Sequence, residues 1–343
     1  MTTTRPAPSS VWGIHDIRGG NDTGPSGCGY FRIVLPFDQL RAHGWDARYA
    51  AGRMPTDVDK AKVVVGERLM FPEVLGEWRR LRQHHRLVYE IDDDIWSIDP
   101  VNLQAYQSFR VHSIQDAVAT CAAMSDLVTV TTEPLAEVIR KRTGQTNIAI
   151  IPNFIEERLL TMERPRRLQV TIGWAGGSSH GKDLMTIAHA VRSVLDTERN
   201  ARLHIVGCDF RPTFGIQKYM ARFTEWEPEP GDFYKHLDFD IGLAPLEPSI
   251  FGLSKSHLKA LEYAALGIPV IASDFAPYQG FVIDGVTGFL CRTQKQWRQR
   301  LRELVNDSDL RESMGAKARE LAAGHTIEGN WHRWAEAYGG LLR

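Results

Sequence analysis

Short apolar runs that alternate with helix-like stretches constrain the fold of this chain more than any other feature. In the first half, KVVVGE (62–67), RLVYEID (86–92) and LVTVTT (127–132) are typical of buried strands. A second series begins with QVTIGWAG (169–176) and RLHIVG (202–207). Strands that alternate with helices at this spacing are parallel and covered by helices on both faces. The sequence therefore predicts an α/β protein with two doubly wound, Rossmann-like sheets that bind ligands at the carboxyl ends of their strands.

The stretch FIEERLLTMERPRRL (154–168) interrupts this rhythm with many charges and a proline, and it marks the connection between two halves. A chain of 343 residues is long enough for two domains with separate cores. We expect an N-terminal, acceptor-side domain over 1–160 and a C-terminal, donor-binding domain over 161–325. A final helix over 326–343 is expected to pack back toward the N-terminal domain, and the two domains are expected to face a central cleft.

Composition argues against several classes of protein. A net charge of -1 provides no overall field that would attract nucleic acid or an anionic membrane. The sequence has no uninterrupted apolar run long enough for a transmembrane segment, and MTTTRPAPSS at the start is no signal peptide. The cysteines form no CxxC pair, which argues against a metal site or a disulfide framework. We therefore expect a cytoplasmic protein with reduced cysteines.

The stretch from Phe251 to Cys291 contains the residues that most directly suggest a ligand. It predicts a loop, a short helix with Lys255, Lys259 and Glu262, a buried strand (IPVIAS), and a glycine-containing turn before a final strand. Lys255 and Glu262 are about two helical turns apart, so both can point out of one end of a β/α layer. A helix start beside cations and a carboxylate suits a ligand with phosphates at one end and hydroxyls at the other. A nucleotide sugar is such a ligand.

The same stretch resembles the donor-binding domain of GT-B glycosyltransferases of family 4, in LKALEYAALGIPVIASDFAPY and DGVTGFL, together with the earlier HIVG and DIGLAPL. PSGCGYFRIVLPFDQLRAHG, VTVTTEPLAEVIRKRTG and IPNF resemble the first domain of that fold. The resemblance covers nearly the whole chain. It implies metal-independent transfer of a sugar from a nucleotide-diphosphate sugar, with retention of the anomeric configuration.

The resemblance also assigns roles in the donor site. Glu262 matches the family glutamate that commonly binds the ribose hydroxyls. Family members usually carry another glutamate eight positions earlier, where this chain has Ser254, so recognition of the sugar is expected to differ. Lys255 is the candidate that offsets the charge growing on the leaving diphosphate, with Lys259 one turn further on and Ser256 between them. The alternative for each is an ordinary solvated side chain.

The segment GWAGGSSHGKDL (173–184) follows a strand and is predicted to open a helix, where backbone N–H groups can hold a phosphate. Gly177 and Ser178 with its adjacent amides are candidate phosphate ligands. His180 stands where the family often has a lysine, and Lys182 is close enough to substitute for it. An ordinary tight turn is the competing interpretation.

Gly27 and Gly29 in GPSGCGYFR suit a close approach of the backbone to the donor phosphates or to the acceptor. Arg32 stands where a dinucleotide-binding fingerprint has its third glycine, which argues against a dehydrogenase. The Arg32 side chain is expected either to reach the cleft or to be exposed.

Three adjacent carboxylates, Asp92, Asp93 and Asp94, follow the strand RLVYEID directly. They repel one another, so they need cations, N–H donors or water nearby. Asp92 or Asp93 is expected to line the acceptor side, as a hydrogen-bond partner or a base, and the alternative is that they cap the following turn. No metal site is predicted here, because adjacent aspartates do not all face one ion.

The function expected from these residues is glycosyl transfer, with the nucleotide-diphosphate sugar as co-substrate and no cofactor. The departing diphosphate can itself accept the proton of the acceptor, a hypothesis taken from the fold analogy. The acceptor is left open among a glycan, a lipid, a small molecule, a protein and a nucleic acid. A nucleotide-sugar epimerase of the same fold and a catalytically degenerate nucleotide-sugar-binding protein, suggested by Ser254, are the alternatives. Trp226 and Tyr234 lie where a base can stack.

Overall fold

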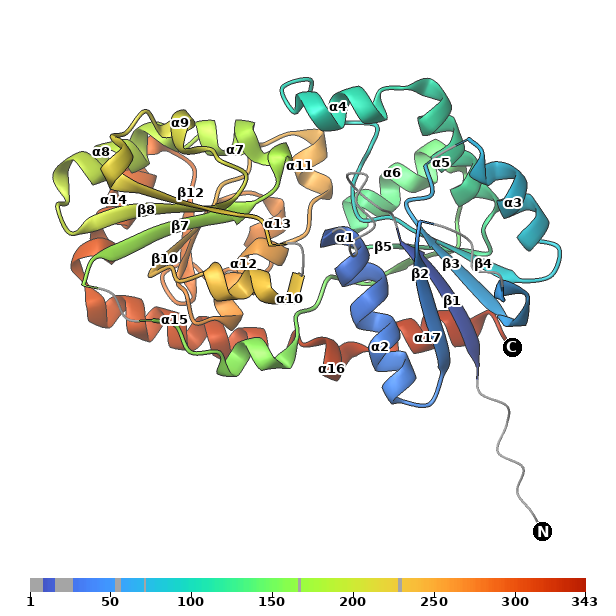
Figure 1. The fold of residues 1–343 in the computed structure, drawn as a ribbon. Helices are drawn as coiled ribbons and strands as arrows, with labels where there is room; N and C mark the ends of the chain where they lie inside the picture. Colours follow the sequence, from blue (N-terminus) through green and yellow to red (C-terminus); the bar gives the residue numbers. More distant parts are fainter. Residues whose placement is uncertain (1–8, 16–26, 53–56, 71, 166–167, 228–229) are drawn as a thin grey trace, which may run out of the picture. The chain divides into compact units, whose positions relative to one another are not determined.

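The computed structural model describes residues 9–15, 27–52, 57–70, 72–165, 168–227 and 230–343, and these residues form two parallel six-stranded sheets (Figure 1). Each sheet belongs to a separate compact unit. Unit 1 comprises Met1–Trp96, Phe109–Asn153 and Ile327–Arg343, and unit 2 comprises Ser97–Ser108 and Phe154–Thr326. The predicted α/β architecture with two doubly wound sheets is confirmed.

The strands of unit 1 pair in the order β2-β1-β3-β4-β5-β6. They are β1 (Ser10–His15), β2 (Asp46–Ala51), β3 (Val63–Glu67), β4 (Arg86–Glu90), β5 (Leu127–Val130) and β6 (Ile148–Ile150). The helical segments are α1 (Gly27–Gly29), η1 (Tyr30–Val34), α2 (Leu35–Ala42), η2 (Val58–Lys60), α3 (Val74–Leu81), α5 (His112–Met124), α6 (Glu133–Thr143), α16 (Ile327–Asn330) and α17 (His332–Gly340). β3 and β5 are buried throughout, as expected of strands covered on both faces.

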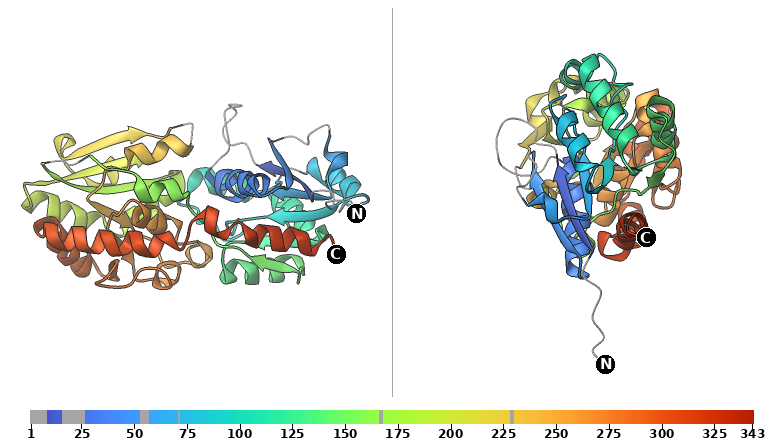
Figure 2. Two further views of the ribbon diagram at one scale, coloured as in Figure 1. Left: turned by 90° about the horizontal axis from the view of Figure 1, so that it is seen from below. Right: turned by 90° about the vertical axis from the view of Figure 1, so that its right-hand side faces the viewer.

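The chain returns to unit 1 after Thr326, and α17 packs against α2, where Figure 2 shows it in red. Trp334 and Tyr338 on α17 are fully buried. The Tyr338 ring lies 6.2 Å from that of Phe37 on α2, and Trp331 stacks on His43 at 3.8 Å. These aromatic contacts make the C-terminal helices part of the core of unit 1.

The strands of unit 2 pair in the order β12-β11-β10-β7-β8-β9. They are β7 (Val170–Gly176), β8 (Ala201–Gly207), β9 (Ala221–Glu225), β10 (Ile241–Ala244), β11 (Val270–Ser273) and β12 (Gly288–Cys291). Its longer helices are α8 (Ala188–Thr197), α12 (Leu258–Ala265), α14 (Gln294–Asn306) and α15 (Ser308–Ala323). The shorter helical segments are η3 (Glu157–Thr161), η4 (Ser178–His180), α7 (Gly181–Met185), α9 (Arg211–Phe214), η5 (Lys218–Met220), α10 (Pro230–Phe233), η6 (Tyr234–His236), α11 (Ile250–Ser254) and α13 (Ala276–Gln279), while α4 spans Leu103–Phe109.

The core of unit 2 lies between the sheet and helices α8 and α14. Trp174 on β7 is fully buried, and the ring of Phe239 covers Gly173 next to it. A Cβ at residue 173 would overlap that ring, so only glycine fits there. The close contact brings the strand β7 and the Phe239 segment together beneath the carboxyl edge of the sheet.

Two strands were missed in the sequence, and one helical region is divided in the structure. β2 and β9 were not predicted, because both are edge strands that carry arginines and half-exposed residues in place of an apolar run. A helix opens in the segment GWAGGSSHGKDL as predicted, but it is interrupted at Thr186–Ile187 and forms α7 and α8. Among the described helices, none combines the length and hydrophobicity that crossing a bilayer requires.

Candidate functional site

Charged side chains of unit 2 converge where β7 ends and α12 begins. His180 follows β7 directly, Lys259 and Glu262 lie on α12, and Lys255 precedes that helix. Burial is the main cause that lowers the pKa of both His180 and Lys259, and the nearby charge of Lys255 lowers both a little further. The structure therefore brings together four of the residues predicted for the donor site, at the edge where parallel sheets bind their ligands.

Lys259 is a half-buried cation of this cluster. Its Nζ donates to the carbonyl oxygen of Ala175 and lies 5.0 Å above the ring of Trp174. Burial lowers the pKa of Lys259 to about 8, opposed by the carboxylates of Glu262 and Asp183. A phosphate bound here would favour the charged form of the ammonium group and raise its pKa.

Glu262 is held by Tyr234, whose hydroxyl donates to Oε1 at 3.0 Å. Burial raises the pKa of the Glu262 carboxyl to about 7, while the charge of Lys259 and the Tyr234 hydrogen bond oppose the rise. Tyr234 itself is buried, so it positions Glu262 and is no stacking platform. A carboxylate fixed in this way is suited to accept hydrogen bonds from a pair of hydroxyls.

Lys255 does not lie on the same helix as Glu262, contrary to the prediction. α11 ends at Ser254, and Lys255 has an extended backbone (φ -66°, ψ 152°) before α12 starts at Leu258. The Lys255 Nζ lies 4.4 Å from the ring centre of Phe251. At the break, Ser256 Oγ accepts the N–H of Leu258 at 3.4 Å, and Ser249 caps the other end of α11 by accepting the N–H of Gly252. Ser254 is 2% exposed.

The turn after β7 carries the other predicted donor ligands. Gly177 and Ser178 are exposed, and His180 caps the five-residue helix α7. His180 Nδ1 lies 2.8 Å from Oδ2 of Asp183, a residue that the sequence did not single out. The only sequence signal for this pair is the spacing of three residues, which places both side chains on one helical face.

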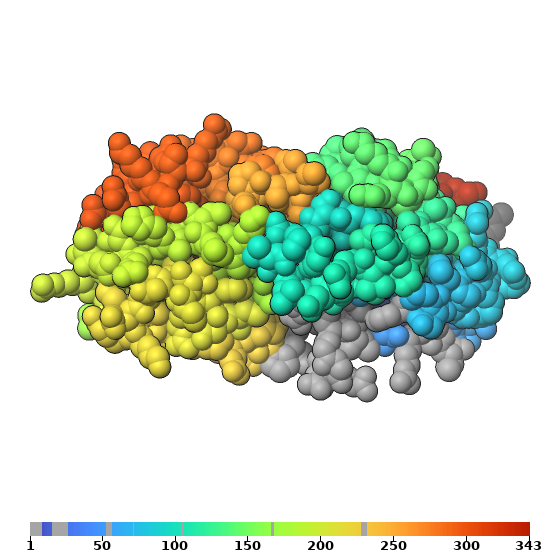
Figure 3. Space-filling view, turned by 90° about the horizontal axis from the view of Figure 1, so that it is seen from above, coloured from blue at the N-terminus to red at the C-terminus, as the bar shows by residue number. Residues whose placement is uncertain are grey.

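Lys182 is paired with two carboxylates of unit 2. Its Nζ lies 2.7 Å from Asp99 Oδ2 and 2.8 Å from Glu247 Oε2. Asp99 belongs to the segment Ser97–Ser108, which lies at the surface and is teal in Figure 3. A phosphate at Lys182 would have to compete with both carboxylates. Neither partner could be found from the sequence, because each is more than sixty positions away.

Trp226 follows β9 and is 44% exposed, with its ring stacked on that of Phe233 at 4.5 Å. Gly207 at the end of β8 has φ +100°, and a Cβ there would overlap the carbonyl oxygen of Gly176 and approach Trp226 to 2.9 Å. The carboxyl ends of β7 and β8 and this indole therefore lie side by side. The flat exposed ring suits stacking of a planar ligand group.

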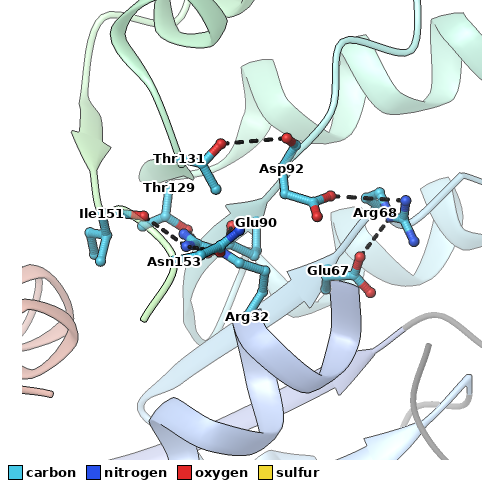
Figure 4. Close-up of polar contacts among 9 residues, drawn as sticks. All are labelled: Arg32, Glu67, Arg68, Glu90, Asp92, Thr129, Thr131, Ile151 and Asn153. Carbon is cyan, nitrogen blue, oxygen red and sulfur yellow. Dashed lines mark hydrogen bonds and ion pairs between the residues drawn. The ribbon is translucent and has the colours of Figure 1, made fainter. Parts of the chain in front are cut away.

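In unit 1, Arg32 is fully buried, so neither expectation for it was right. Its guanidinium forms a fork with Glu90, at 2.8 and 3.2 Å (Figure 4). It also donates to the carbonyl oxygen of Ile151 at 2.7 Å and to Asn153 Oδ1 at 3.0 Å. Burial raises the pKa of Glu90 to about 7, although Arg32 and the hydroxyl of Thr129 both favour its ionised form. This network is structural, and it joins η1 to β4, to β5 and to the segment that follows β6.

The predicted acceptor-side carboxylates have different environments. Asp92 Oδ1 lies 3.9 Å from Nη1 of Arg68, whose Nε donates to Glu67 at 2.6 Å (Figure 4). Arg68 is buried and has φ +43°, a left-handed conformation that side chains rarely adopt. Asp94 accepts the N–H of Trp96 at 3.0 Å and thus caps the turn, while Asp93 is partly exposed.

Cys28, Glu67 and Asp92 offer ligand atoms within 4.8 Å of one another, the one such group among the described residues. The Arg68 guanidinium is bound to Glu67 and faces Asp92, so both carboxylates already have a cation. A metal ion there would have to displace that contact against the charge of Arg68. The group does not fit a metal site.

Nearby, Gly27 is exposed, whereas a Cβ at Gly29 would come within 2.9 Å of the His15 side chain.

Solved structures with the same fold are glycosyltransferases of the GT-B class. Sucrose-phosphate synthase from Thermosynechococcus elongatus is 14% identical, with a TM-score of 0.68 over 97% of this chain and 99% of that one. HepE from Anabaena, solved with UDP-glucose, is 10% identical, with a TM-score of 0.68 over 96% and 99%. TarM from S. aureus, solved with UDP among its ligands, is 16% identical, with a TM-score of 0.60 over 80% of this chain and 55% of TarM.

The sequence of unit 2 gives a second, independent identification. Residues 169–307 match the family described as Glycosyl transferases group 1. No curated protein matches the chain by sequence. The resemblance seen in the sequence is confirmed: residues 169–307 match the group 1 glycosyl transferases, and the described residues have the fold of GT-B glycosyltransferases.

Proposed function

We propose that the protein transfers a glycosyl group from a nucleotide-diphosphate sugar to an acceptor, with retention of configuration and without a metal ion. The observation that carries the proposal is the convergence of Lys255, Lys259 and His180 with the carboxylate of Glu262 in the part of the chain that matches group 1 glycosyltransferases. Cations at one end and a hydrogen-bond acceptor at the other match the two ends of such a donor. HepE and TarM were solved with UDP or a UDP-sugar.

Each part of the donor has a counterpart among these residues. Lys259 and Lys255 hold the diphosphate, together with the turn at Gly177 and Ser178. Glu262, fixed by Tyr234, accepts hydrogen bonds from the ribose hydroxyls. The exposed ring of Trp226 stacks on the base. Ser254 provides no carboxylate at the sugar end, so the sugar is recognised by other groups.

In the reaction, the bond between the anomeric carbon and the diphosphate oxygen breaks, and a bond to the acceptor oxygen forms. The proton of the acceptor hydroxyl passes to the departing diphosphate. The lysine charges offset the negative charge that develops on that leaving group, which is the contribution that a metal ion makes elsewhere. Asp92 and Asp93, at the carboxyl edge of the first sheet, are the candidates for binding the acceptor by hydrogen bonds.

The test is a thermal-shift screen of nucleotide-diphosphate sugars, followed by turnover assays with the donor that stabilises the protein most. Transfer to an acceptor, insensitive to EDTA and with the donor's anomeric configuration in the product by NMR, supports the proposal. Interconversion of the donor without acceptor would identify an epimerase. Donor binding without any turnover across glycan, lipid, protein and small-molecule acceptors would identify a binding protein and refute the proposed transfer.

A further inference from the structure

His180 and Asp183 form a pair at the wall of the proposed donor site. His180 Nδ1 lies 2.8 Å from Asp183 Oδ2, and Asp183 Oδ1 accepts the N–H of Glu247 at 2.8 Å. The carboxylate is therefore fixed through both oxygens, and it keeps a proton on Nδ1 of the imidazole. Nε2 is the ring nitrogen that can meet a ligand.

The charged groups that face His180 are Asp183 on α7, Lys259 on α12 and Lys255 before that helix. The ring of Trp174 packs edge-on against the imidazole at 5.8 Å. Burial and the two lysine charges lower the pKa of His180 below its usual 6.5, while Asp183 opposes this. His180 is thus neutral near pH 7 and sits beside two cations and one anion.

We propose that His180 takes up a proton from solvent when the diphosphate of a donor binds, and that its Nε2–H then holds a phosphate oxygen. This inference rests on the proposed function. It adds that His180 binds the diphosphate and that its protonation accompanies donor binding. The diphosphate brings two negative charges that offset Lys255 and Lys259, so the repulsion that keeps the ring neutral is removed. Asp183 is already in place to stabilise the imidazolium.

The consequence is a third cation that exists only while the donor or its diphosphate product is bound. Because binding and protonation are linked, the affinity for the diphosphate falls by up to about tenfold per pH unit between the pKa of His180 in the free protein and its higher pKa in the complex. Deprotonation of the ring favours release of the product. Lysine in this position would already be charged near pH 7 without a ligand and would lack this dependence there.

The experiment is isothermal titration calorimetry of the full chain with UDP-glucose near pH 7, in two buffers with different heats of ionisation. The phosphates of this probe are diesters with no pKa near neutrality, so the ligand exchanges no proton. Lys259 and Glu262 also titrate in this range, and the comparison with His180→Gln isolates the contribution of the histidine. On binding, the wild type should take up more protons than His180→Gln, by about half a proton or more per ligand.

Two further variants separate protonation from structure. His180→Lys should keep the affinity within about threefold of the wild type and lose the histidine-dependent uptake, because it is already charged near pH 7 without a ligand. His180→Gln should lose both affinity and uptake. His189→Gln is the matched control, since His189 is exposed on α8 and outside the site, and it should leave both unchanged.

Equal proton uptake by the wild type and His180→Gln, with UDP-glucose bound by both, would overturn this inference and leave the proposed function standing. Equal pH dependence of affinity in the wild type and His180→Lys would overturn it as well. Absence of UDP-glucose binding to the wild type at any pH from 6 to 9 would count against both the inference and a UDP-sugar donor site.

Discussion

Replacing Glu262 by glutamine should weaken donor binding and stabilise the fold at the same time. Burial raises the pKa of Glu262 from 4.5 to about 7, so the native state binds a proton that the unfolded chain has already lost between these values. The free energy of unfolding therefore falls as the pH rises from 4.5 to 7. Each pKa unit corresponds to about 1.4 kcal/mol, which gives an upper limit of about 3 kcal/mol.

The side chain of Glu262 keeps some contact with solvent, so we expect about 1–2 kcal/mol of this to be realised. Glu262→Gln removes the cost, and it should be more stable than the wild type at pH 8 by that amount and no more stable at pH 4. Loss of charge-assisted hydrogen bonds to the ribose should weaken the donor by about 2 kcal/mol, roughly thirtyfold.

Urea unfolding at the two pH values measures the first effect, and donor titration measures the second. Glu320→Gln on α15, an exposed position, is the matched control and should change neither. Unchanged donor affinity would refute the ribose-binding role. If Glu262→Gln were less stable than the wild type at pH 8, the interaction with Lys259 would outweigh the burial cost.

Three other changes follow from contacts in the two units. Arg32→Met leaves the Glu90 carboxylate buried without its partner and should lower the free energy of unfolding in urea by about 3–5 kcal/mol. Arg86→Met, at the exposed pair with Asp126, is the control and should lower it by less than about 1 kcal/mol. Similar losses in the two variants would contradict the assignment of a buried network. Gly173→Ala should give little folded protein by circular dichroism, because its Cβ meets the Phe239 ring, while the exposed Gly76→Ala should fold normally; equal thermal stability would show that the ring moves aside. Asp99→Asn removes the ion pair with Lys182 and should speed amide hydrogen exchange in residues 97–108 by up to about fivefold. Asp196→Asn, in a surface pair on α8, is the control and should leave exchange in these residues unchanged. Unchanged exchange in Asp99→Asn would mean that Lys182 does not hold this segment.

The sequence predicts the central strands of both sheets well, and the reason is burial. β3, β5 and β7 are covered on both faces, so they are continuous apolar runs that can be read without knowledge of their neighbours. β2 and β9 lie at sheet edges, where half-exposed residues remove that signal. Edge strands depend on the partner strand, which the local sequence does not show.

The sequence indicates which residues belong to the candidate site better than it indicates how they are arranged. Lys259 and Glu262 were placed on one helix correctly, while Lys255 was not, because the polar run from Ser254 to Ser256 separates two helices. The pairing of Glu262 with Tyr234 joins residues 28 positions apart. Such contacts arise only when strands and loops distant in sequence meet, so no local pattern indicates them.

The burial of Trp334 and Tyr338 has a consequence for how the chain acquires its structure. Trp334 lies over the Arg32 guanidinium, 5.4 Å away, so the ion pair with Glu90 gains its apolar cover from residues made some three hundred positions later. During synthesis from the N-terminus, the Arg32–Glu90 pair of unit 1 stays incompletely shielded from water until the C-terminal helices have been made. By then the long continuous part of unit 2, Phe154–Thr326, is already complete. Unit 2 is therefore expected to fold first. Unit 1 contains the strands that are translated first, yet it is expected to complete its fold last.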